Sequence, residues 1–409
     1  MLNANENGRI VHETTRTNIH NEAVTEKVKS YKKLYPKLCS YDNLDLAFKK
    51  ARKGKSKQKY VKEFEKDLQN NLLNLKKELL AFEYKPTKLT KFIVRDPKTR
   101  VIRKSVFKDR IVHHAVVNIL DPIYEKVFLY DNYANRKNKG SLNAINRFDY
   151  YKRKISNNGK LVNNSKNKNM IEGYCLKADL KHFFDSVDQT ILIKILKRKI
   201  RDNNVLWLIK QILENHISIG GGGERKGMPL GNMTSQFFAN VYLNELDYFV
   251  KHKLKVKCYI RYVDDFIILH KNKKVLLEYK RKITNYLKNL GLELHPDKTK
   301  IFSMYRGVTF LGYKLFYYFR LLKKRNVRYF LRRLQRFEER YNENLITSSD
   351  VLDSIEGWLA YAIWADSYNL RKRIIKEINN RFKFNWLINS TFRLHIKLSL
   401  IKKVNLNKF

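Results

Sequence analysis

The sequence predicts an α+β fold that combines an antiparallel sheet with amphipathic helices. Runs rich in β-branched and aromatic residues at 91–94, 174–178 and 259–269 are typical of strands. Apolar residues recur three and four positions apart at 61–82 and at 351–363, a spacing typical of helices with one buried face. The chain therefore contains both kinds of element, and its strands are expected to carry the functional residues.

The composition indicates a folded chain that binds nucleic acid. Its 409 residues suffice for two or three domains, and a hydrophobic content of 43% excludes a disordered chain. Lys and Arg number 85 against 39 Asp and Glu, which gives a net charge of +46. So large an excess repels itself unless a polyanion offsets it. A long nucleic acid is the expected partner, with a ribosome-associated or membrane-surface protein as the alternative.

No membrane segment or secretion signal is expected. No stretch approaches 18 uninterrupted apolar residues, and residues 1–16 lack the apolar core of a signal peptide. Cys39, Cys175 and Cys258 are far apart in the sequence, so they offer neither a zinc site nor a disulfide framework. These features predict a cytoplasmic protein in a reducing environment, without a membrane partner.

The first third of the chain is expected to be mainly helical. The helix at 61–82 is followed by strands at 91–94 and 101–102, which are separated by a turn at 96–99. A further helix is expected to begin near Asp109.

Two segments have the composition of loops. Residues 156–169 are polar with little to bury, and they predict a flexible surface insertion. The four glycines at 220–223 suit either a phosphate cradle or a mobile linker. The linker is favoured because no Lys-Ser or Lys-Thr pair follows them as in a P-loop.

The chain is expected to become helical and strongly basic after Gly312. Residues 320–336 contain eight Lys or Arg and no acidic residue. Four arginines fall at helical spacing: Arg325, Arg328, Arg332 and Arg336. One face of this helix is therefore expected to follow a phosphate backbone. A merely solvated face is the less favoured alternative, because no acids are interspersed.

Two adjacent acids, Asp264 and Asp265, lie inside the apolar run 259–269. Carboxylates in such surroundings are costly to desolvate unless a cation neutralises them, so the pair is either a solvated turn or part of a metal site. A distant acid, Asp179, ends the predicted strand 174–178. If that strand lies beside the hairpin, the carboxylates converge and can hold two divalent ions roughly 3.5–4 Å apart.

These residues and their spacing resemble a known family. The strand ending in Asp179 with Phe184 five residues later, together with Tyr-x-Asp-Asp at 262–265, resembles motifs A and C of reverse transcriptases. Further segments resemble the other motifs in the family's order, namely the fingers motifs at 97–100 and 109–112, motif B at 227–236, motif D at 292–299 and the primer grip at 310–313. The resemblance covers about residues 45–370.

The resemblance implies a right-hand polymerase fold with fingers, a palm built on the antiparallel sheet, and a helical thumb. The expected division is an N-terminal arm at 1–44, fingers at 45–170, a palm at 171–315, and a basic thumb with a C-terminal tail at 316–409. The motif B region is expected to belong partly to the fingers.

The resemblance also implies roles for single residues at the reacting centre. Asp179, Asp264 and Asp265 would bind two Mg²⁺ ions, or Mn²⁺ in their place, with Asp264 more critical than Asp265. Lys298 would protonate the leaving pyrophosphate. Phe184 would act as a steric gate that rejects a 2′-hydroxyl.

Other residues are expected to hold the substrates. The residues that would bind the incoming dNTP are Lys98, Arg100, Arg110, Gly231 and Gln236. The residues that would bind the RNA–cDNA duplex are Arg320, Lys323, Lys324, Arg325, Arg328, Arg332 and Arg336.

Motif B narrows the subtype. It has Leu230-Gly231 and Ser235-Gln236, where retroviral and group II intron enzymes usually carry Gln-Gly and Ser-Pro. This form resembles the reverse transcriptases of diversity-generating retroelements, which copy a template RNA with errors at adenines and work with a small basic accessory protein. The alternatives are a phage-defence reverse transcriptase with a noncoding RNA, template-independent or protein-primed synthesis, and a non-catalytic RNA-binding maturase. A bacterial, archaeal or phage-encoded protein is expected.

Overall fold

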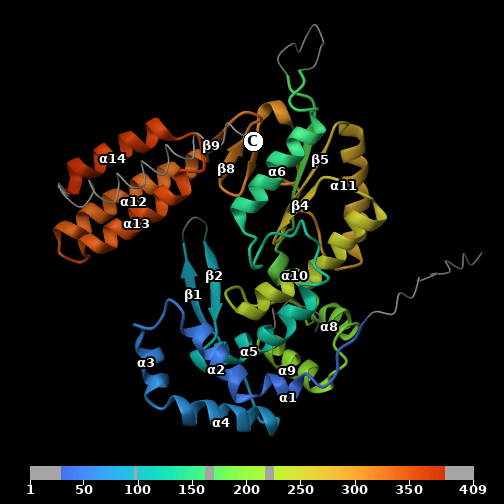
Figure 1. Cartoon of the computed structure of the whole chain (residues 1–409), viewed down its shortest axis with the longest axis vertical. Coiled ribbons are helices and arrows are strands. Elements are labelled where there is room, and N and C mark those ends of the chain that lie inside the picture. Colours follow the sequence, from blue (N-terminus) through green and yellow to red (C-terminus); the bar gives the residue numbers. More distant parts are fainter. Residues whose placement is uncertain (1–28, 96–98, 162–169, 217–224, 383–409) are drawn as a thin grey trace, which may run out of the picture.

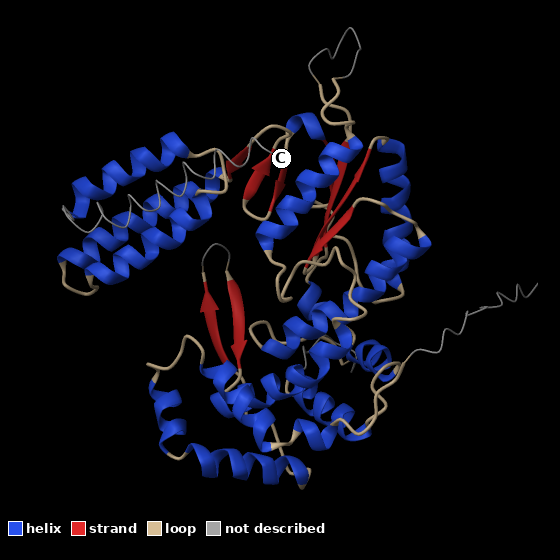
Figure 2. Ribbon diagram, viewed as in Figure 1, coloured by secondary structure: helices blue, strands red, loops and turns tan. Residues whose placement is uncertain are grey.

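The computed structural model describes residues 29–95, 99–161, 170–216 and 225–382. Figure 1 shows three parts: a helical part with a protruding hairpin at the bottom, a sheet with flanking helices at the upper right, and a group of helices at the upper left. Figure 2 shows the strands of these parts as separate sheets. No helix in the described residues is long and apolar enough to cross a membrane.

The helical part at the bottom is formed by the first third of the chain. Its elements are α1 (Tyr35–Leu38), α2 (Tyr41–Arg52), α3 (Lys59–Lys66), α4 (Leu68–Leu80), β1 (Thr90–Val94), β2 (Arg100–Lys104) and α5 (Phe107–Tyr124). Helices α2 and α5 pack along each other, and the Asn43 side chain of α2 donates to the Ala115 carbonyl of α5. Strands β1 and β2 form the protruding antiparallel hairpin.

The expected N-terminal arm is described only from residue 29, and its part from Tyr35 to Leu44 packs into the core. Leu38 and Leu44 are fully buried in the core. The backbone N–H groups of Leu34 and Tyr35 donate to the Asp202 carboxylate, at 2.6 and 3.0 Å. The sequence gave no sign of this anchor, because Asp202 lies 167 residues further along the chain.

The expectation of a single helix at 61–82 is wrong, because the chain forms α3 and α4 there, with a break at Asp67. Asp67 has φ −134° and ψ 53°, outside the helical region. Its carboxylate accepts from the Asn70 side chain, and the Asn71 side chain donates to the Phe64 carbonyl. Such side chains offer the backbone an alternative to the helical ladder. Each helix buries part of the predicted apolar set, namely Val61 in α3 and Leu72, Leu75 and Leu79 in α4.

The main sheet has the strand order β4-β5-β3-β6, and all neighbouring strands are antiparallel. Its strands are β3 (Tyr174–Asp179), β4 (Tyr259–Tyr262), β5 (Asp265–His270) and β6 (Lys300–Ser303). One face packs against α10 (Met233–Tyr248) and α11 (Lys273–Lys288), and the other against α6 (Ser141–Ile155). Between β3 and α10 lie α7 (Phe183–Ser186), α8 (Gln189–Lys197) and α9 (Asn203–Glu214).

The C-terminal part begins with strands, so the expectation of helix directly after Gly312 is wrong. Strands β7 (Val308–Phe310), β8 (Tyr313–Leu315) and β9 (Arg320–Leu322) form a small antiparallel sheet. Its buried residues alternate over only three positions a strand, too short a pattern for the sequence to indicate. The helices α12 (Lys324–Asn342), α13 (Ser348–Ala362) and α14 (Tyr368–Phe382) follow.

Two expected loops fall largely outside the described residues. These are the insertion at 156–169, of which 162–169 are not described, and the glycine run at 220–223.

Candidate active site

Three acids meet where strands β3 and β5 lie side by side. The strands pair from Tyr174 opposite His270 to Asp179 opposite Asp265, so the two acids are direct antiparallel partners. Asp264 sits in the two-residue turn between β4 and β5. The condition set by the sequence, that the strand of Asp179 lies beside the hairpin, is therefore met.

The turn of this hairpin is fixed by an ion pair beneath it. Val263 has φ +54°, which is uncommon for a β-branched residue. Its carbonyl accepts from Arg261 at 3.1 Å. The same guanidinium holds Asp247 through two bonds of 2.7 and 2.6 Å, and both side chains are fully buried. Sequence reasoning missed this pair, although an arginine inside an apolar strand was a signal that a buried acid had to exist.

Two of the acids, Asp264 and Asp265, have raised pKa values. Burial raises the pKa of Asp264, and the nearby Asp179 carboxylate adds to the effect, while Lys298 and Arg100 oppose it. Burial raises the pKa of Asp265 to about 7, and both Asp179 and Asp264 add to the effect. Like charges held this closely favour a cation between them. Carboxylate oxygens are the ligands that Mg²⁺ and Mn²⁺ prefer, so the donor set fits either ion.

Lys298 lies against this cluster. Its ammonium donates to Oδ2 of Asp179. The preceding segment is tied to the end of β3, because the His295 N–H donates to the Asp179 carbonyl at 2.7 Å. Among the residues that the structure describes, no three His, Cys, Asp or Glu side chains form a ready metal-ligand set. Lys298 thus places a positive charge beside the three acids.

The motif B loop is bonded to the backbone of Phe184. The Met228 N–H donates to the Phe184 carbonyl at 2.7 Å. Gly231 follows in the same loop with φ +117°, and a Cβ there would come within 2.9 Å of Cγ2 of Ile102 in β2. The loop and the hairpin β1–β2 are thus in contact. Gln236 lies near the start of α10 and is partly buried.

The three cationic residues expected to bind the triphosphate lie in different surroundings from one another. Arg100 is exposed at the start of β2 and is close enough to lower the pKa of Asp264. Arg110 donates to the Ser105 carbonyl at 2.9 Å and lies over the Tyr60 ring, so it is engaged within the helical part. Lys98 lies outside the described residues.

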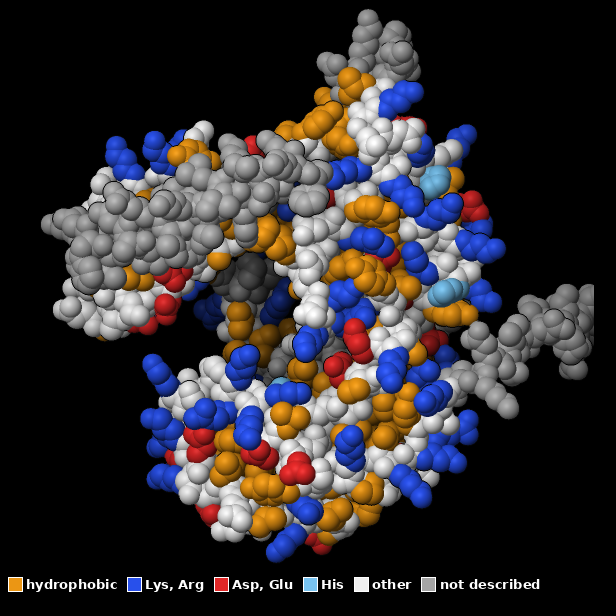
Figure 3. All heavy atoms as spheres, in the orientation of Figure 1, with side chains coloured by type: hydrophobic (Ala, Val, Ile, Leu, Met, Phe, Trp, Pro, Cys, Tyr) orange, Lys and Arg blue, Asp and Glu red, His pale blue; other side chains and the backbone are white. Residues whose placement is uncertain are grey.

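Helix α12 presents most of the expected basic row to solvent. Arg325, Arg328, Arg332 and Arg336 are exposed, as are Lys323 and Lys324 before them. Arg320 is placed differently, because it lies in β9 and pairs with Asp149 of α6. Figure 3 shows a hollow between the α12–α14 helices and the helical part below them.

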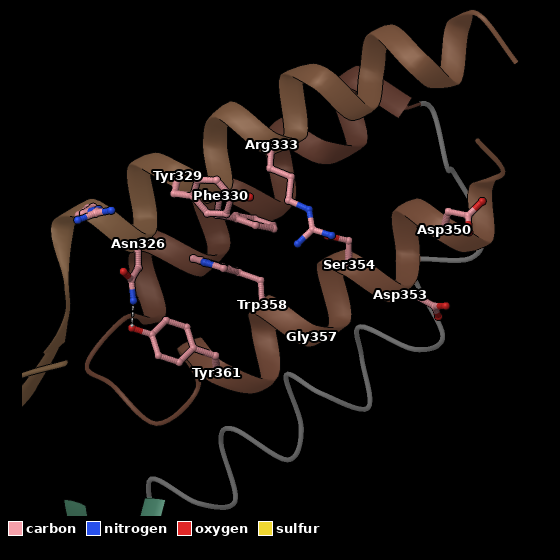
Figure 4. Close-up of a pocket in the computed structure, with 11 residues that line it drawn as sticks. Asn326, Tyr329, Phe330, Arg333, Asp350, Asp353, Ser354, Gly357, Trp358 and Tyr361 are labelled. Carbon is pink, nitrogen blue, oxygen red and sulfur yellow. Dashed lines mark hydrogen bonds between the residues drawn. The ribbon is translucent and has the colours of Figure 1, made fainter. Parts of the chain in front are cut away.

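A pocket of about 650 Å³ opens between α12 and α13 (Figure 4). The Phe330 ring of α12 stacks on the Trp358 ring of α13 inside it, with centroids 4.3 Å apart. Asn326 donates to the Tyr361 hydroxyl at 3.0 Å across the two helices. This pocket belongs to the C-terminal helices and contains none of the three acids.

The chain matches known proteins over the region that carries the site. Residues 90–315, more than half of the chain, match the family model described as reverse transcriptase (RNA-dependent DNA polymerase). Protein YkfC of Escherichia coli (strain K12) is 27% identical over 278 residues, which cover 59% of this chain and 70% of that protein. The group II intron-encoded protein LtrA of Lactococcus lactis subsp. cremoris is 25% identical over 283 residues, which cover 53% of this chain and 44% of that protein.

Other relatives are matched over less of their length. The putative COX1/OXI3 intron 2 protein of Saccharomyces cerevisiae is 23% identical over 323 residues, 34% of that protein. The chain thus spans less than half of the matched intron proteins. Among solved structures, apo telomerase from Candida tropicalis aligns with a TM-score of 0.40 and 15% identity, over 56% of this chain and 47% of that one.

Proposed function

The chain belongs to the reverse transcriptase family, and from this premise we propose that it synthesises cDNA on an RNA template by two-metal-ion nucleotidyl transfer. Its fold is the right-hand polymerase fold that the sequence predicted. We assign the fingers to residues 45–170, the palm to 171–315 and the thumb to 316–409. The observation that carries the proposal is the register of β3 and β5, which sets Asp179 opposite Asp265 and next to Asp264.

The palm acids would hold Mg²⁺ or Mn²⁺. Bound there, the two ions would lower the pKa of the primer hydroxyl and neutralise the charge of the leaving pyrophosphate. Asp179, Asp264 and Asp265 would supply the carboxylate oxygens for these ions. The Asp179 carboxylate adds to the raised pKa of the other two, so a cation there would relieve their repulsion. Lys298 donates to Asp179, and from that position its ammonium would protonate the pyrophosphate.

The surrounding residues would position the substrates. Arg100, with Lys98, would pair with the triphosphate of the dNTP, because guanidinium and ammonium groups bind phosphate oxygens. The Phe184 ring would lie under the sugar and exclude a 2′-hydroxyl, while Gly231 and Gln236 would line the nascent base pair. The exposed arginines of α12 would follow the phosphates of the RNA–cDNA duplex, whose A-form shape is recognised more than its sequence.

We assign the protein to a diversity-generating retroelement, acting in the cytoplasm with a dedicated template RNA and a small basic accessory protein. The support is the motif B form with Leu230-Gly231 and Ser235-Gln236. The second candidate is a maturase role on an intron RNA, which is favoured by the resemblance to intron-encoded LtrA. Phage defence with a noncoding RNA, and template-independent or protein-primed synthesis, are further outcomes that the experiment below separates.

The test is cDNA synthesis by the purified chain on a primed RNA template with Mg²⁺. We expect Asp264→Ala to abolish synthesis, while the exposed Asp297→Ala, a matched acid near Lys298, retains it. Synthesis that persists in Asp264→Ala would overturn the two-metal assignment.

The biological role is tested by sequencing the RNA that copurifies with the protein and the cDNA made from it. Errors concentrated at adenines support the diversity-generating role. Faithful or repetitive cDNA favours defence, cDNA without a template favours untemplated synthesis, and intron RNA without any cDNA favours the maturase.

A further inference from the structure

Two tyrosines outside the proposed active site are unusually exposed. Tyr130 precedes α6 and is 65% exposed, and Tyr150 lies on α6 and is 52% exposed. Arg147 lies between them, with its guanidinium carbon 5.3 Å from the Tyr130 ring centroid and 5.1 Å from that of Tyr150. Lys139 lies 3.4 Å from the Tyr130 centroid. We call Tyr130, Lys139, Arg147 and Tyr150 the aromatic–cation ladder.

The ladder is held in place by buried partners. Asp131 is 3% exposed, and it accepts from Nε of Arg147 at 2.8 Å and from the Tyr151 hydroxyl at 2.7 Å. The Lys139 ammonium donates to the Tyr130 carbonyl at 2.9 Å. Both cations are therefore fixed before any ligand arrives, so little side-chain freedom is lost when one binds.

The charge around the ladder is positive and uncompensated. Residues 125–155 contain eight Lys or Arg and three acids. Each of the three acids, Glu125, Asp131 and Asp149, pairs with a basic side chain. Four further cations are exposed, namely Lys126, Lys137, Arg153 and Lys154. A ligand that meets this surface is therefore an anion.

The ladder is attached to the edge of the main sheet. The Arg261 N–H donates to the Asp131 carbonyl and the Tyr133 N–H donates to the Arg261 carbonyl, each at 2.9 Å. Arg261 belongs to β4, the strand that leads into Asp264. The ladder therefore lies at the β4 edge of the main sheet, beside the strand that leads into Asp264.

We propose that the aromatic–cation ladder binds single-stranded nucleic acid, with unpaired bases stacking on Tyr130 and Tyr150 and phosphates meeting the exposed cations. Aromatic rings interleaved with Lys and Arg recognise single strands because every base offers a π-face once it is unpaired. In a duplex these faces are covered by neighbouring pairs, so the exposed rings would gain nothing from it. This binding proposal does not depend on the proposed cDNA synthesis.

The test measures binding of the full chain to a fluorescent 20-nucleotide oligouridine, by anisotropy at physiological salt. We expect Tyr130→Ala with Tyr150→Ala to weaken binding roughly 10-fold or more, and the double change to Phe to preserve it, because the rings remain. Tyr368→Ala, which removes an exposed tyrosine of α14, is the matched control and is expected to bind normally. The Asp264→Ala variant is also expected to bind normally, which separates this inference from the proposed chemistry.

A double alanine variant that binds as tightly as the wild type overturns the proposal. So does an equal loss in Tyr368→Ala, or an equal loss of affinity for a blunt RNA duplex. Photo-crosslinking of the unaltered protein to 4-thiouridine RNA gives an answer even if a variant fails to fold. Crosslinks at Tyr130 or Tyr150 support binding of RNA at the aromatic–cation ladder. Crosslinks confined to other segments overturn the proposal. Binding of a protein at the ladder in the absence of RNA would also overturn it.

Discussion

Two charged clusters on the hairpin β4–β5 are built in opposite ways. Beneath the turn, Arg261 and Asp247 are both fully buried, and each charge is matched by its partner through two hydrogen bonds. At the turn, Asp264 and Asp265 lie beside Asp179, whose carboxylate adds to the raised pKa of both. Lys298 is the cation bonded to this corner, and it is 42% exposed.

The difference separates a structural charge from a functional one. A buried pair with complete hydrogen bonds needs nothing from outside, and removing one partner leaves an unpaired charge. A cluster of like charges keeps the protein less stable than it would be without them, and such clusters are found where a ligand supplies the missing charge. The first cluster is therefore expected to govern stability, and the second activity.

The largest expected effect on stability is at the buried pair. Arg261→Met leaves Asp247 buried without a counter-charge, so we expect the free energy of unfolding to fall by about 3–5 kcal/mol in chemical denaturation. Adding Asp247→Leu should restore most of the loss, because no charge then remains unpaired. If Arg261→Met is as stable as the wild type, the buried pair does not govern stability.

The next effect concerns Lys298, the cation that donates to Asp179. Lys298→Gln keeps a hydrogen-bond donor but cannot supply an acidic proton, so we expect cDNA synthesis to slow roughly 100-fold. Lys300→Gln, an exposed lysine two residues further on, should stay within about two-fold of the wild type. Equal rates in both variants would show that Lys298 only neutralises Asp179.

A smaller effect, with the opposite sign, is expected at the turn. Asp264→Asn removes one of three crowded charges, so we expect the metal-free protein to gain about 1 kcal/mol of stability while it loses synthesis. Denaturation in the presence of a chelator measures the gain. A loss of stability comparable to that of Arg261→Met would mean that the corner is structural as well.

A further expected effect is a pH dependence of stability that comes from Asp265. The pKa of Asp265 is about 7 in the folded protein against an ordinary 3.8. Asp265 thus keeps its proton to a higher pH in the folded protein than in the unfolded chain. The wild type therefore loses stability as pH rises from about 4 through 7. The Asp265→Asn variant has no carboxyl group to ionise at this position, so it does not lose stability in this way. Its advantage in melting temperature over the wild type should therefore widen by about 2–4 °C between pH 5 and pH 8, whereas a constant difference would contradict the raised pKa.

The sequence was sufficient for the parts that depend on local pattern. The α+β class is confirmed, because strands and helices each follow their own apolar period. Asp179 and Asp264 were expected together if the strand that ends in Asp179 lay beside the hairpin that carries Asp264, and the pairing of β3 with β5 meets that condition. The exposed arginines of α12 likewise follow from helical spacing alone.

The sequence was insufficient where partners are distant or patterns short. Nothing local pairs Asp202 with the backbone of α1, or Arg261 with Asp247. The break at Asp67 depends on side-chain bonds that compete with a good helical period. The diversion of Arg320 to Asp149 needed the placement of α6 against β9.

The pairing of β3 with β5 also limits how the length of this protein can change. Side chains alternate between the two faces of a strand, so one inserted or deleted residue in either strand would turn its acid to the opposite face. The sheet would still form, but Asp179 and Asp265 would no longer share an edge. Insertions and deletions compatible with activity are therefore expected in connections between elements rather than within β3 or β5.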